Sequence, residues 1–364
     1  MPANPTRFLL IGCGGITYAH LPAFEKFPDR LKLNAACDPS PAARDSIVER
    51  TQKLGAITTY ADVESALAAE RPNVDAALIT TPHFLHHPQA KACIEAGLPV
   101  LIEKPICNTL AEATELDALS RQHNVLVVAG QNRRYEPEAL QARRWIQDTP
   151  AEFGELRSFD LHAWQNVEAW IATKPDKNAD CWILDKERAG GGVIISLMIH
   201  YLDMVRGLTG LDYSEVSARG RSDPPFKNGA ESTCSAMLTM SNGATGTLHA
   251  NYLAPRMPDP GEGFTLFGTK GYLGRDQKWT HATTLGEEPR DWFWQFEKIE
   301  SVAPDPDLAP DSSSFVNQLL AFQHAIETGN APMNHIADNL NTIATVQAIY
   351  DSMATDGAAT PVQR

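Results

Sequence analysis

The segment Phe8-Leu9-Leu10-Ile11-Gly12-Cys13-Gly14-Gly15 decides how the first part of this chain folds. Its four apolar residues predict a buried strand, and the glycines after them predict a tight turn into a helix that runs to about Phe27. Gly12 permits the turn, and Gly14 lets a pyrophosphate approach the backbone at the helix N-terminus. Such turns also occur in proteins that bind no nucleotide, so the motif indicates a dinucleotide site only together with further residues.

Asp38 is the residue that strengthens this interpretation. It follows the second predicted strand, residues 31–37, about twenty residues beyond the glycine turn, where a carboxylate can bind both ribose hydroxyls of an adenosine. Its negative charge would repel a 2′-phosphate, so NAD is favoured over NADP. The alternative is that Asp38 only starts the turn before Pro39.

Short apolar strands alternate with helical segments through residue 130. The expected strands are 7–11, 31–37, 74–79, 99–102 and 125–129, and the expected helices after the first one are 41–54, 87–96 and 109–123. Apolar strands without polar alternation are typical of a parallel sheet that helices cover on both faces. Residues 1–130 are therefore predicted to form an NAD(P)-binding Rossmann domain.

Beyond residue 130 the strands become longer and alternate between apolar and polar side chains. We expect strands at 156–164, 213–220, 232–241, 244–252 and 264–267, and helices at 138–147, 315–327 and 337–354. Asn242-Gly243 predicts a hairpin between two of these strands. The pattern favours an α+β domain over 131–364 with an open, mainly antiparallel sheet, which makes the whole chain α/β. The segment 286–314, rich in proline and acidic residues, is expected to be a long surface loop.

Two residues have side chains suited to proton transfer. Lys104, in Glu103-Lys104-Pro105, closes a predicted parallel strand at the sheet edge where ligands bind, and it can donate a hydrogen bond to a substrate hydroxyl or move a proton. Pro105 favours an extended backbone at Lys104. His200 follows a triple glycine and can take or give a proton near neutral pH. The structural alternatives are a solvated Glu-Lys pair and a helical histidine bonded to Asp203.

The composition excludes several classes of function. The chain has 364 residues, long enough for two domains, and a formal net charge of −14, which argues against nucleic acid as a partner. No apolar run reaches the roughly 20 residues that span a bilayer, so no membrane partner is expected. Six cysteines without a C-x-x-C pair favour a reducing cytoplasm. His83, His86 and His87 have no cysteine or carboxylate near them in the sequence to complete a site, so no metal is expected.

The chain contains three motifs: the glycine turn at residues 12–15, Glu103-Lys104-Pro105, and the triple glycine 190–192 followed by His200. In this order and spacing they resemble the motifs of the Gfo/Idh/MocA family, which includes glucose-fructose oxidoreductases and inositol dehydrogenases. The resemblance runs nearly from end to end of the chain. It also includes Thr81-Pro82 with His86, the segment 96–105, the segment 130–135, Phe267-Gly268-Thr269-Lys270-Gly271 and the closing helix around Ala348-Ile349-Tyr350-Asp351-Ser352.

This resemblance implies an NAD(P)-dependent dehydrogenase that oxidises a secondary alcohol of a sugar, polyol or inositol-like substrate. The family's catalytic lysine and histidine correspond to Lys104 and His200. The cofactor-binding residues implied are Gly12, Gly14, Gly15, Ile16, Thr17, Asp38, Thr80, Thr81, Pro82, His86, Glu103 and Lys104. The substrate-binding residues implied are Asn132, Arg133, Asn166, Ser196 and His200; the aromatic Trp182 is added to them, although such residues more often belong to a core.

Ser196 departs from the family pattern, which usually has an aspartate four residues before the histidine. A serine can neither act as a base nor form an anionic bond to His200, so the proton relay and a simple hexose or inositol substrate are both in question. Two alternative functions stay open: an NAD-dependent glycosidase, and a ligand-sensing protein without activity on the same fold. The resemblance also implies a homodimer or homotetramer that uses the open sheet for its contacts.

Overall fold

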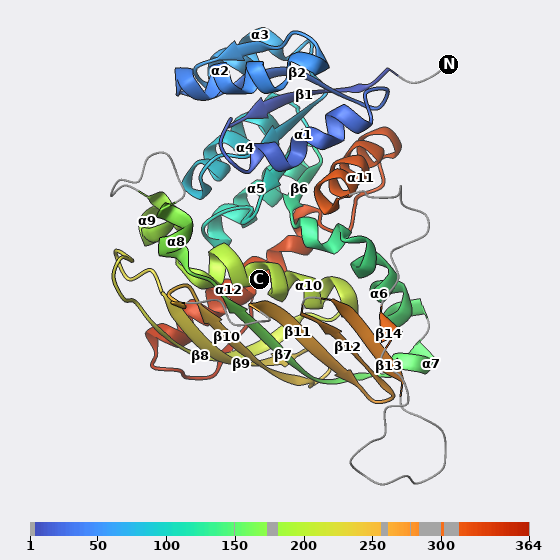
Figure 1. Ribbon diagram of the computed structural model, residues 1–364, viewed down its shortest axis with the longest axis vertical. Coiled ribbons are helices and arrows are strands. Elements are labelled where there is room, and N and C mark those ends of the chain that lie inside the picture. Colours follow the sequence, from blue (N-terminus) through green and yellow to red (C-terminus); the bar gives the residue numbers. More distant parts are fainter. Residues whose placement is uncertain are drawn as a thin grey trace. The chain divides into compact units, whose positions relative to one another are not determined.

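The computed structural model describes residues 4–148, 150–172, 181–255, 261–276, 278–283, 300–301 and 313–363. The chain forms two compact units, each built around its own sheet (Figure 1). The first unit consists of Met1–Tyr135 and Ser312–Leu340, and the second consists of Glu136–Asp311 and Asn341–Arg364. A segment near the C-terminus therefore belongs to the N-terminal unit.

The first unit contains a six-stranded parallel sheet in the order β3-β2-β1-β4-β5-β6. Its strands are β1 (Thr6–Ile11), β2 (Leu31–Cys37), β3 (Thr58–Tyr60), β4 (Ala76–Ile79), β5 (Val100–Glu103) and β6 (Val127–Gly130). All five expected strands are present, so the predicted Rossmann sheet is confirmed. The strand order reverses at β1, between β2 and β4, and ligands bind at the carboxyl ends of strands at such a switch point.

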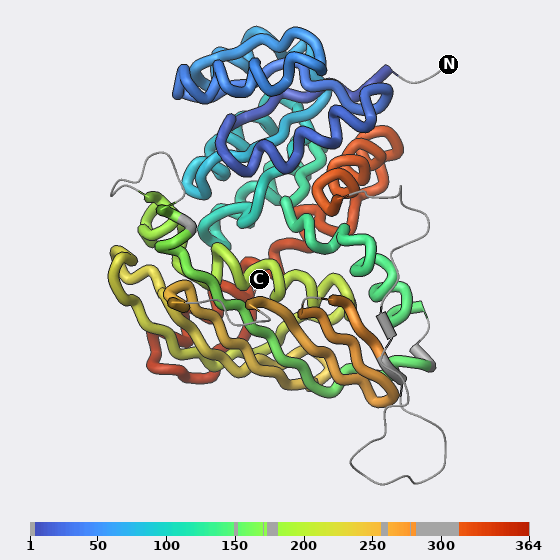
Figure 2. The backbone as a smooth tube through the Cα atoms, in the orientation of Figure 1, coloured from blue at the N-terminus to red at the C-terminus, as the bar shows by residue number. Residues whose placement is uncertain are grey.

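Helices cover this sheet and complete its core. They are α1 (Thr17–Lys26), α2 (Pro41–Arg50), α3 (Val63–Glu70), α4 (His86–Glu95), α5 (Leu110–His123) and α11 (Ser314–Thr328). Figure 2 shows α11, close to the C-terminus, beside the N-terminal elements. The buried ring of Phe8 on β1 contacts Phe24 of α1 at 5.4 Å and Phe322 of α11 at 6.2 Å between ring centroids. The returning helix is thus part of the first unit's hydrophobic core.

The second unit contains a nine-stranded sheet in the order β14-β13-β12-β11-β7-β10-β9-β8-β15. Its strands are β7 (Leu156–Trp164), β8 (Tyr213–Arg221), β9 (Thr233–Met240), β10 (Thr245–Asn251), β11 (Glu262–Gly268), β12 (Gly271–Arg275), β13 (Trp279–Thr283), β14 (Glu300–Ser301) and β15 (Thr360–Pro361). Among the described strand pairs of this second sheet, only β7 and β10 pair in parallel. The predicted open, mainly antiparallel sheet is therefore confirmed.

The Asn242-Gly243 hairpin joins β9 and β10 as predicted, with Gly243 at φ +86°. Strands of this sheet bury alternate side chains: on β9, Ala236 and Leu238 are buried, whereas Met237 is 64% exposed. The helices of this unit are α6 (Pro137–Asp148), α7 (Pro150–Phe153), α8 (Val167–Ala172), α9 (Lys186–Ala189), α10 (Ile199–Thr209) and α12 (Ile336–Ala354), whose first residues belong to the other unit. Most of the expected loop 286–314 lies outside the described residues.

One helical stretch among the described residues is long and apolar enough to cross a membrane by length and composition. It is Lys186–Thr209, with a mean hydropathy of 1.3, and 89% of its most apolar window is buried inside the fold. Tyr201, within it, is fully buried and contacts Phe264 of β11 at 6.4 Å between ring centroids. Burial in the core of the second unit accounts for this composition.

Candidate active site

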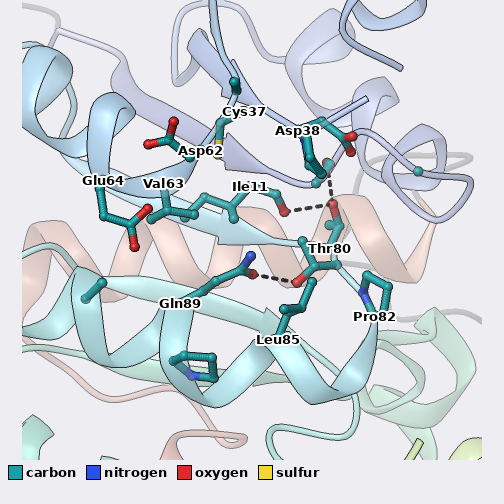
Figure 3. A pocket seen from close by; sticks show the side chains of 17 residues that line it. Ile11, Cys37, Asp38, Asp62, Val63, Glu64, Thr80, Pro82, Leu85 and Gln89 are labelled. Atoms are coloured by element: carbon teal, nitrogen blue, oxygen red, sulfur yellow. Dashed lines mark hydrogen bonds between the residues drawn. The ribbon is translucent and has the colours of Figure 1, made fainter. Parts of the chain in front are cut away.

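A cavity of about 590 Å³ lies at the carboxyl ends of β1, β2 and β4, where the strand order reverses (Figure 3). Its volume falls within the range of small-molecule and cofactor sites. The cavity is lined by Ile11, Gly12, Gly14, Cys37, Asp38, Pro39, Ala61, Asp62, Val63, Glu64, Thr80, Thr81, Pro82, Leu85, Pro88, Gln89 and Ala92.

The glycine turn forms one wall of this cavity. Gly12 has φ +95°, and a Cβ atom there would lie 2.8 Å from Cγ2 of Thr81 and 3.0 Å from its backbone nitrogen. Only glycine fits this position without strain. A Cβ atom on Gly14 would meet no atom within 4 Å, so the backbone of Gly14 faces open space. The turn thus has the bare backbone that a pyrophosphate needs at a helix N-terminus.

Thr17 occupies the place of the third glycine in the usual fingerprint. Its side chain is fully buried, and its Oγ1 lies 3.0 Å from the Gly12 carbonyl oxygen and 2.8 Å from Oγ1 of Thr80. Thr80 Oγ1 lies 2.8 Å from the same carbonyl. Thr17 therefore stabilises the turn against β4 and does not line the cavity. Gly15 and Ile16 lie exposed at the turn.

Asp38 follows β2 and lines the cavity. Its Oδ2 accepts the backbone N–H of Cys13 at 2.9 Å, and its Oδ1 accepts the N–H of Ser40 at 2.9 Å. A carboxylate has about four lone-pair sites, so both oxygens keep acceptor capacity for ribose hydroxyls. Asp62 and Glu64 line the same cavity and add negative charge. This acidic lining suits NAD and opposes a 2′-phosphate.

The segment after β4 forms another wall of the cavity through Thr80, Thr81 and Pro82. His86 lies behind this wall and is fully buried. Its Nδ1 lies 2.7 Å from the Pro105 carbonyl oxygen, and its Nε2 lies 2.9 Å from that of Thr81. Burial lowers the pKa of His86. The ring of His86 thus lies between the segment after β4 and the segment after β5, where its neutral form donates to one of the two carbonyl oxygens, and it is not among the residues that line the cavity.

Lys104 directly follows β5, at the same edge of the sheet as the cavity. The side chain of Glu103 before it is buried, and its Oε2 accepts the backbone N–H of Lys104 at 3.1 Å. A Cβ atom on Gly130 would lie 2.7 Å from Cα of Glu103, so the glycine of β6 permits this close approach. Glu103, expected to bind the cofactor, therefore supports the backbone of Lys104.

His20 of α1 is a residue that the sequence analysis missed. Its buried Nε2 lies 2.8 Å from Oε1 of Glu103. A signal was present, because His20 occurs on the same helical face as the apolar Leu21 and Phe24, both buried. A polar residue on such a face needs a partner.

His200 lies on α10, directly after the single π-helical turn Ile194–Met198 among the described residues. Glu231 fixes the start of this helical segment, because its carboxylate accepts the N–H groups of Gly192 and Ile194, each at 2.8 Å. A Cβ atom on Gly192 would lie 1.9 Å from the carbonyl oxygen of Glu231, so this position requires glycine. Burial raises the pKa of Glu231. π-helical turns frequently occur at functional sites.

Ser196 lies within this π-helical turn and is 3% exposed. Asp203, one turn beyond His200, accepts a hydrogen bond from Oγ1 of Thr342 at 2.7 Å. Asp203 thus takes part in a buried network of the second unit.

The remaining expected substrate residues lie in both units. Asn132 donates from Nδ2 to Oγ of Ser314 at 2.8 Å, and Arg133 follows it in the first unit. In the second unit, Oδ1 of Asn166 accepts the N–H of Ala169 and caps α8, while Trp182 is partly exposed. Lys104 and His200 likewise belong to different units. Their convergence on one substrate stays a prediction.

No group of three His, Cys, Asp or Glu side chains placed to hold a metal ion occurs among the described residues.

Comparison with known proteins agrees with this geometry. Residues 6–131 match the model of an oxidoreductase family with an NAD-binding Rossmann fold, and residues 139–274 match the GFO/IDH/MocA C-terminal domain. The chain belongs to the GFO/IDH/MocA family. The resemblance seen in the sequence is confirmed, and the NAD-binding fold of the matched family agrees with a cavity at the glycine turn.

Individual members of the GFO/IDH/MocA family are similar to this chain over different lengths. The 1,5-anhydro-D-fructose reductase of Ensifer adhaerens is 29% identical over 79% of this chain and 80% of its own. A putative UDP-kanosamine synthase oxidoreductase subunit of Amycolatopsis mediterranei is 33% identical over 52% of this chain, which spans 48% of that relative. The solved levoglucosan dehydrogenase, in complex with NADH and levoglucosan, has a TM-score of 0.82 at 21% identity, covering 99% of this chain and 100% of that one.

Proposed function

We propose that this protein is an NAD-dependent dehydrogenase that oxidises a secondary alcohol of a sugar, polyol or cyclitol. The observation that carries the proposal is the position of Lys104 at the carboxyl end of β5, two strands from the glycine turn of β1 in the same sheet. Relatives named for anhydro sugars, the 1,5-anhydro-D-fructose reductase and the levoglucosan dehydrogenase, support the substrate class.

Each residue of the proposed site has a separate task. Gly12 and Gly14 give the bare backbone for the pyrophosphate, and Asp38 binds the adenosine ribose. NAD, when bound, supplies the acceptor for the carbinol hydride. His200 takes the hydroxyl proton, and the Lys104 ammonium donates a hydrogen bond to the same oxygen, which stabilises its growing negative charge. Ser196 supplies no carboxylate to this relay.

The test is turnover of NAD by the full chain across a panel of sugars, anhydro sugars, polyols and inositols. Lys104→Met should lower turnover about 10²-fold or more and leave NAD binding largely unchanged, because the lysine acts on the reacting oxygen. Lys91→Met is the matched control, since Lys91 is a partly exposed lysine of the same unit, paired with Glu115. Unchanged turnover in Lys104→Met would remove the lysine from the reaction.

The same panel separates the two alternatives. A sensor would bind NAD(H) and oxidise no compound. A glycosidase would release free sugar from a glycoside with no net change in the absorbance of the reduced cofactor.

A further inference from the structure

We infer that His20 is a positioning residue for Lys104 and acts through the buried carboxylate of Glu103. The inference deepens the proposed function and rests on it, because that function gives Lys104 its part in the reaction. It assigns a task to a histidine that lies outside the cavity.

The His20–Glu103 pair is enclosed by protein. Nε2 of His20 lies 2.8 Å from Oε1 of Glu103, and the two side chains are 1% and 6% exposed. The imidazole also meets the ring of Phe315 edge to face at 5.0 Å between ring centroids. Burying a carboxylate costs free energy unless it is hydrogen-bonded, so the loss of this partner would leave Glu103 incompletely satisfied.

The second oxygen of Glu103 makes the link to the lysine. Oε2 accepts the backbone N–H of Lys104 at 3.1 Å, whereas Oε1 is directed to His20. One carboxylate therefore joins α1 to the backbone of Lys104. Because the backbone at Gly130 approaches Cα of Glu103 closely on the β6 side, Glu103 has little room to move away.

The helix that carries His20 also forms the cofactor turn. Thr17, one turn before His20 on α1, bonds the Gly12 carbonyl. Helix α1 is thus bonded to the glycine turn through Thr17 and to Glu103 through His20. This arrangement fixes the position of the Lys104 backbone relative to the glycine turn. Hydride transfer requires such fixed positions of the reacting groups.

The ring of His20 uses only one of its two nitrogens in hydrogen bonding. Nδ1 is buried and has no hydrogen-bond partner among the described residues. The tautomer with its proton on Nε2 donates to Glu103 and leaves no buried N–H unpaired. Glutamine can present an amide N–H near the same place, and methionine fills a similar volume without a donor.

The chain offers a matched control on its surface. His87 and Glu115 form the same kind of pair in the same unit, with Nε2 and Oε2 3.0 Å apart, but these side chains are 20% and 45% exposed. Such an exposed pair contributes little. His87→Met should therefore behave as the unaltered protein.

The first experiment measures kcat and KM of the full chain for the best substrate of the panel. His20→Met should lower kcat about 10- to 100-fold and change the KM for NAD by no more than about twofold, whereas His20→Gln should recover most of the loss. In the Glu103→Gln background, His20→Met should cause little further loss, because the two residues act as one unit.

The second experiment needs no turnover. Lysines are labelled by reductive methylation with ¹³C-formaldehyde, and the Lys104 signal is assigned by its absence in Lys104→Met. His20→Met should shift or broaden the Lys104 signal and leave that of Lys91 unchanged, whereas His87→Met should leave the Lys104 signal unchanged. Thermal unfolding of each variant separates this local effect from a general loss of structure.

Two results would overturn the inference. The first is a His20→Met protein with a lower unfolding temperature but an unaltered kcat per folded molecule and an unaltered Lys104 signal, since the pair would then serve stability alone. The second is a His20→Gln protein as impaired as His20→Met. If Lys104→Met itself keeps full turnover, the proposed function fails, while the NMR signal still reports whether His20 positions the lysine.

Discussion

Substitution by alanine should have different effects at Gly12 and at Gly14, the two glycines of the cofactor turn. In Gly12→Ala the new methyl group is placed at φ +95° and 2.8 Å from Cγ2 of Thr81, with backbone atoms of Thr80 and Thr81 at 3.0 Å. In Gly14→Ala the methyl group meets no protein atom within 4 Å, and Gly14 lines the cavity in which we propose that NAD binds. Gly12→Ala should therefore destabilise the fold, and Gly14→Ala should weaken NAD binding alone.

The magnitudes follow from these contacts. A non-glycine residue at a strained positive φ costs on the order of 1–3 kcal/mol, and the contacts at Gly12 are partly with rigid backbone, so we expect about 2–4 kcal/mol. For a unit of this size, at about 2–4 °C per kcal/mol, that lowers the unfolding temperature by roughly 4–16 °C. For Gly14→Ala we expect an unfolding temperature within about 1 °C of the unaltered protein and at least a tenfold weaker affinity for NAD, about 1.4 kcal/mol.

Differential scanning calorimetry without cofactor and a calorimetric NAD titration test both halves of this prediction. An unaltered unfolding temperature in Gly12→Ala would show that the turn accepts a side chain at position 12, contrary to the close contacts found there. Full NAD affinity in Gly14→Ala would show that the pyrophosphate does not lie over this turn, and the assignment of the cavity would then be wrong.

Two further predictions concern the walls of the cavity. Asp38→Asn removes the charge and keeps the shape, so it should raise the affinity for NADP relative to NAD about tenfold or more. Titration of both proteins with both nucleotides measures this ratio of affinities. The same ratio in the variant and in the unaltered protein would contradict the assignment of Asp38 to the ribose. Burial lowers the pKa of His86 in the folded state below its ordinary value of about 6.5. The neutral ring therefore contributes fully to the free energy of unfolding above about pH 6.5. Below that pH the stability falls, because the unfolded chain takes up a proton that the folded chain does not. The decrease in unfolding temperature between pH 7.5 and 5.5 should be smaller in His86→Gln, and equal decreases would refute this account.

The sequence was sufficient to predict that both sheets exist and how their strands are mostly paired, but not all of their strands. The apolar runs of β1 and β4 and the alternation along β9 and β10 are strong local signals, because burial on two faces or on one face leaves different patterns. β3 was missed because Thr58-Thr59-Tyr60 contains no apolar run. β12 (Gly271–Arg275) was missed because its two glycines are typical of turns.

The site was predictable only in part. Gly12, Gly14 and Asp38 line one cavity, and this position could be predicted because it depends on backbone conformation and on a fixed place after a strand. His86 and Glu103 were assigned to the cofactor, yet their contacts are with other parts of the protein. His20 could not be paired with Glu103 from sequence, because 83 residues separate them and only the packing of α1 against the sheet brings them together.

The return of α11 to the first unit affects how this protein is made. During synthesis on the ribosome, the Rossmann sheet emerges complete at Gly130, but the surface of Phe8 that Phe322 covers has no partner until almost the whole chain has been translated. The apolar surface that α11 covers in the first unit therefore stays exposed while the strands of the second sheet are being synthesised. A fragment cut after residue 130 would keep that apolar surface uncovered, so the two halves of this enzyme are not independent modules that can be expressed apart.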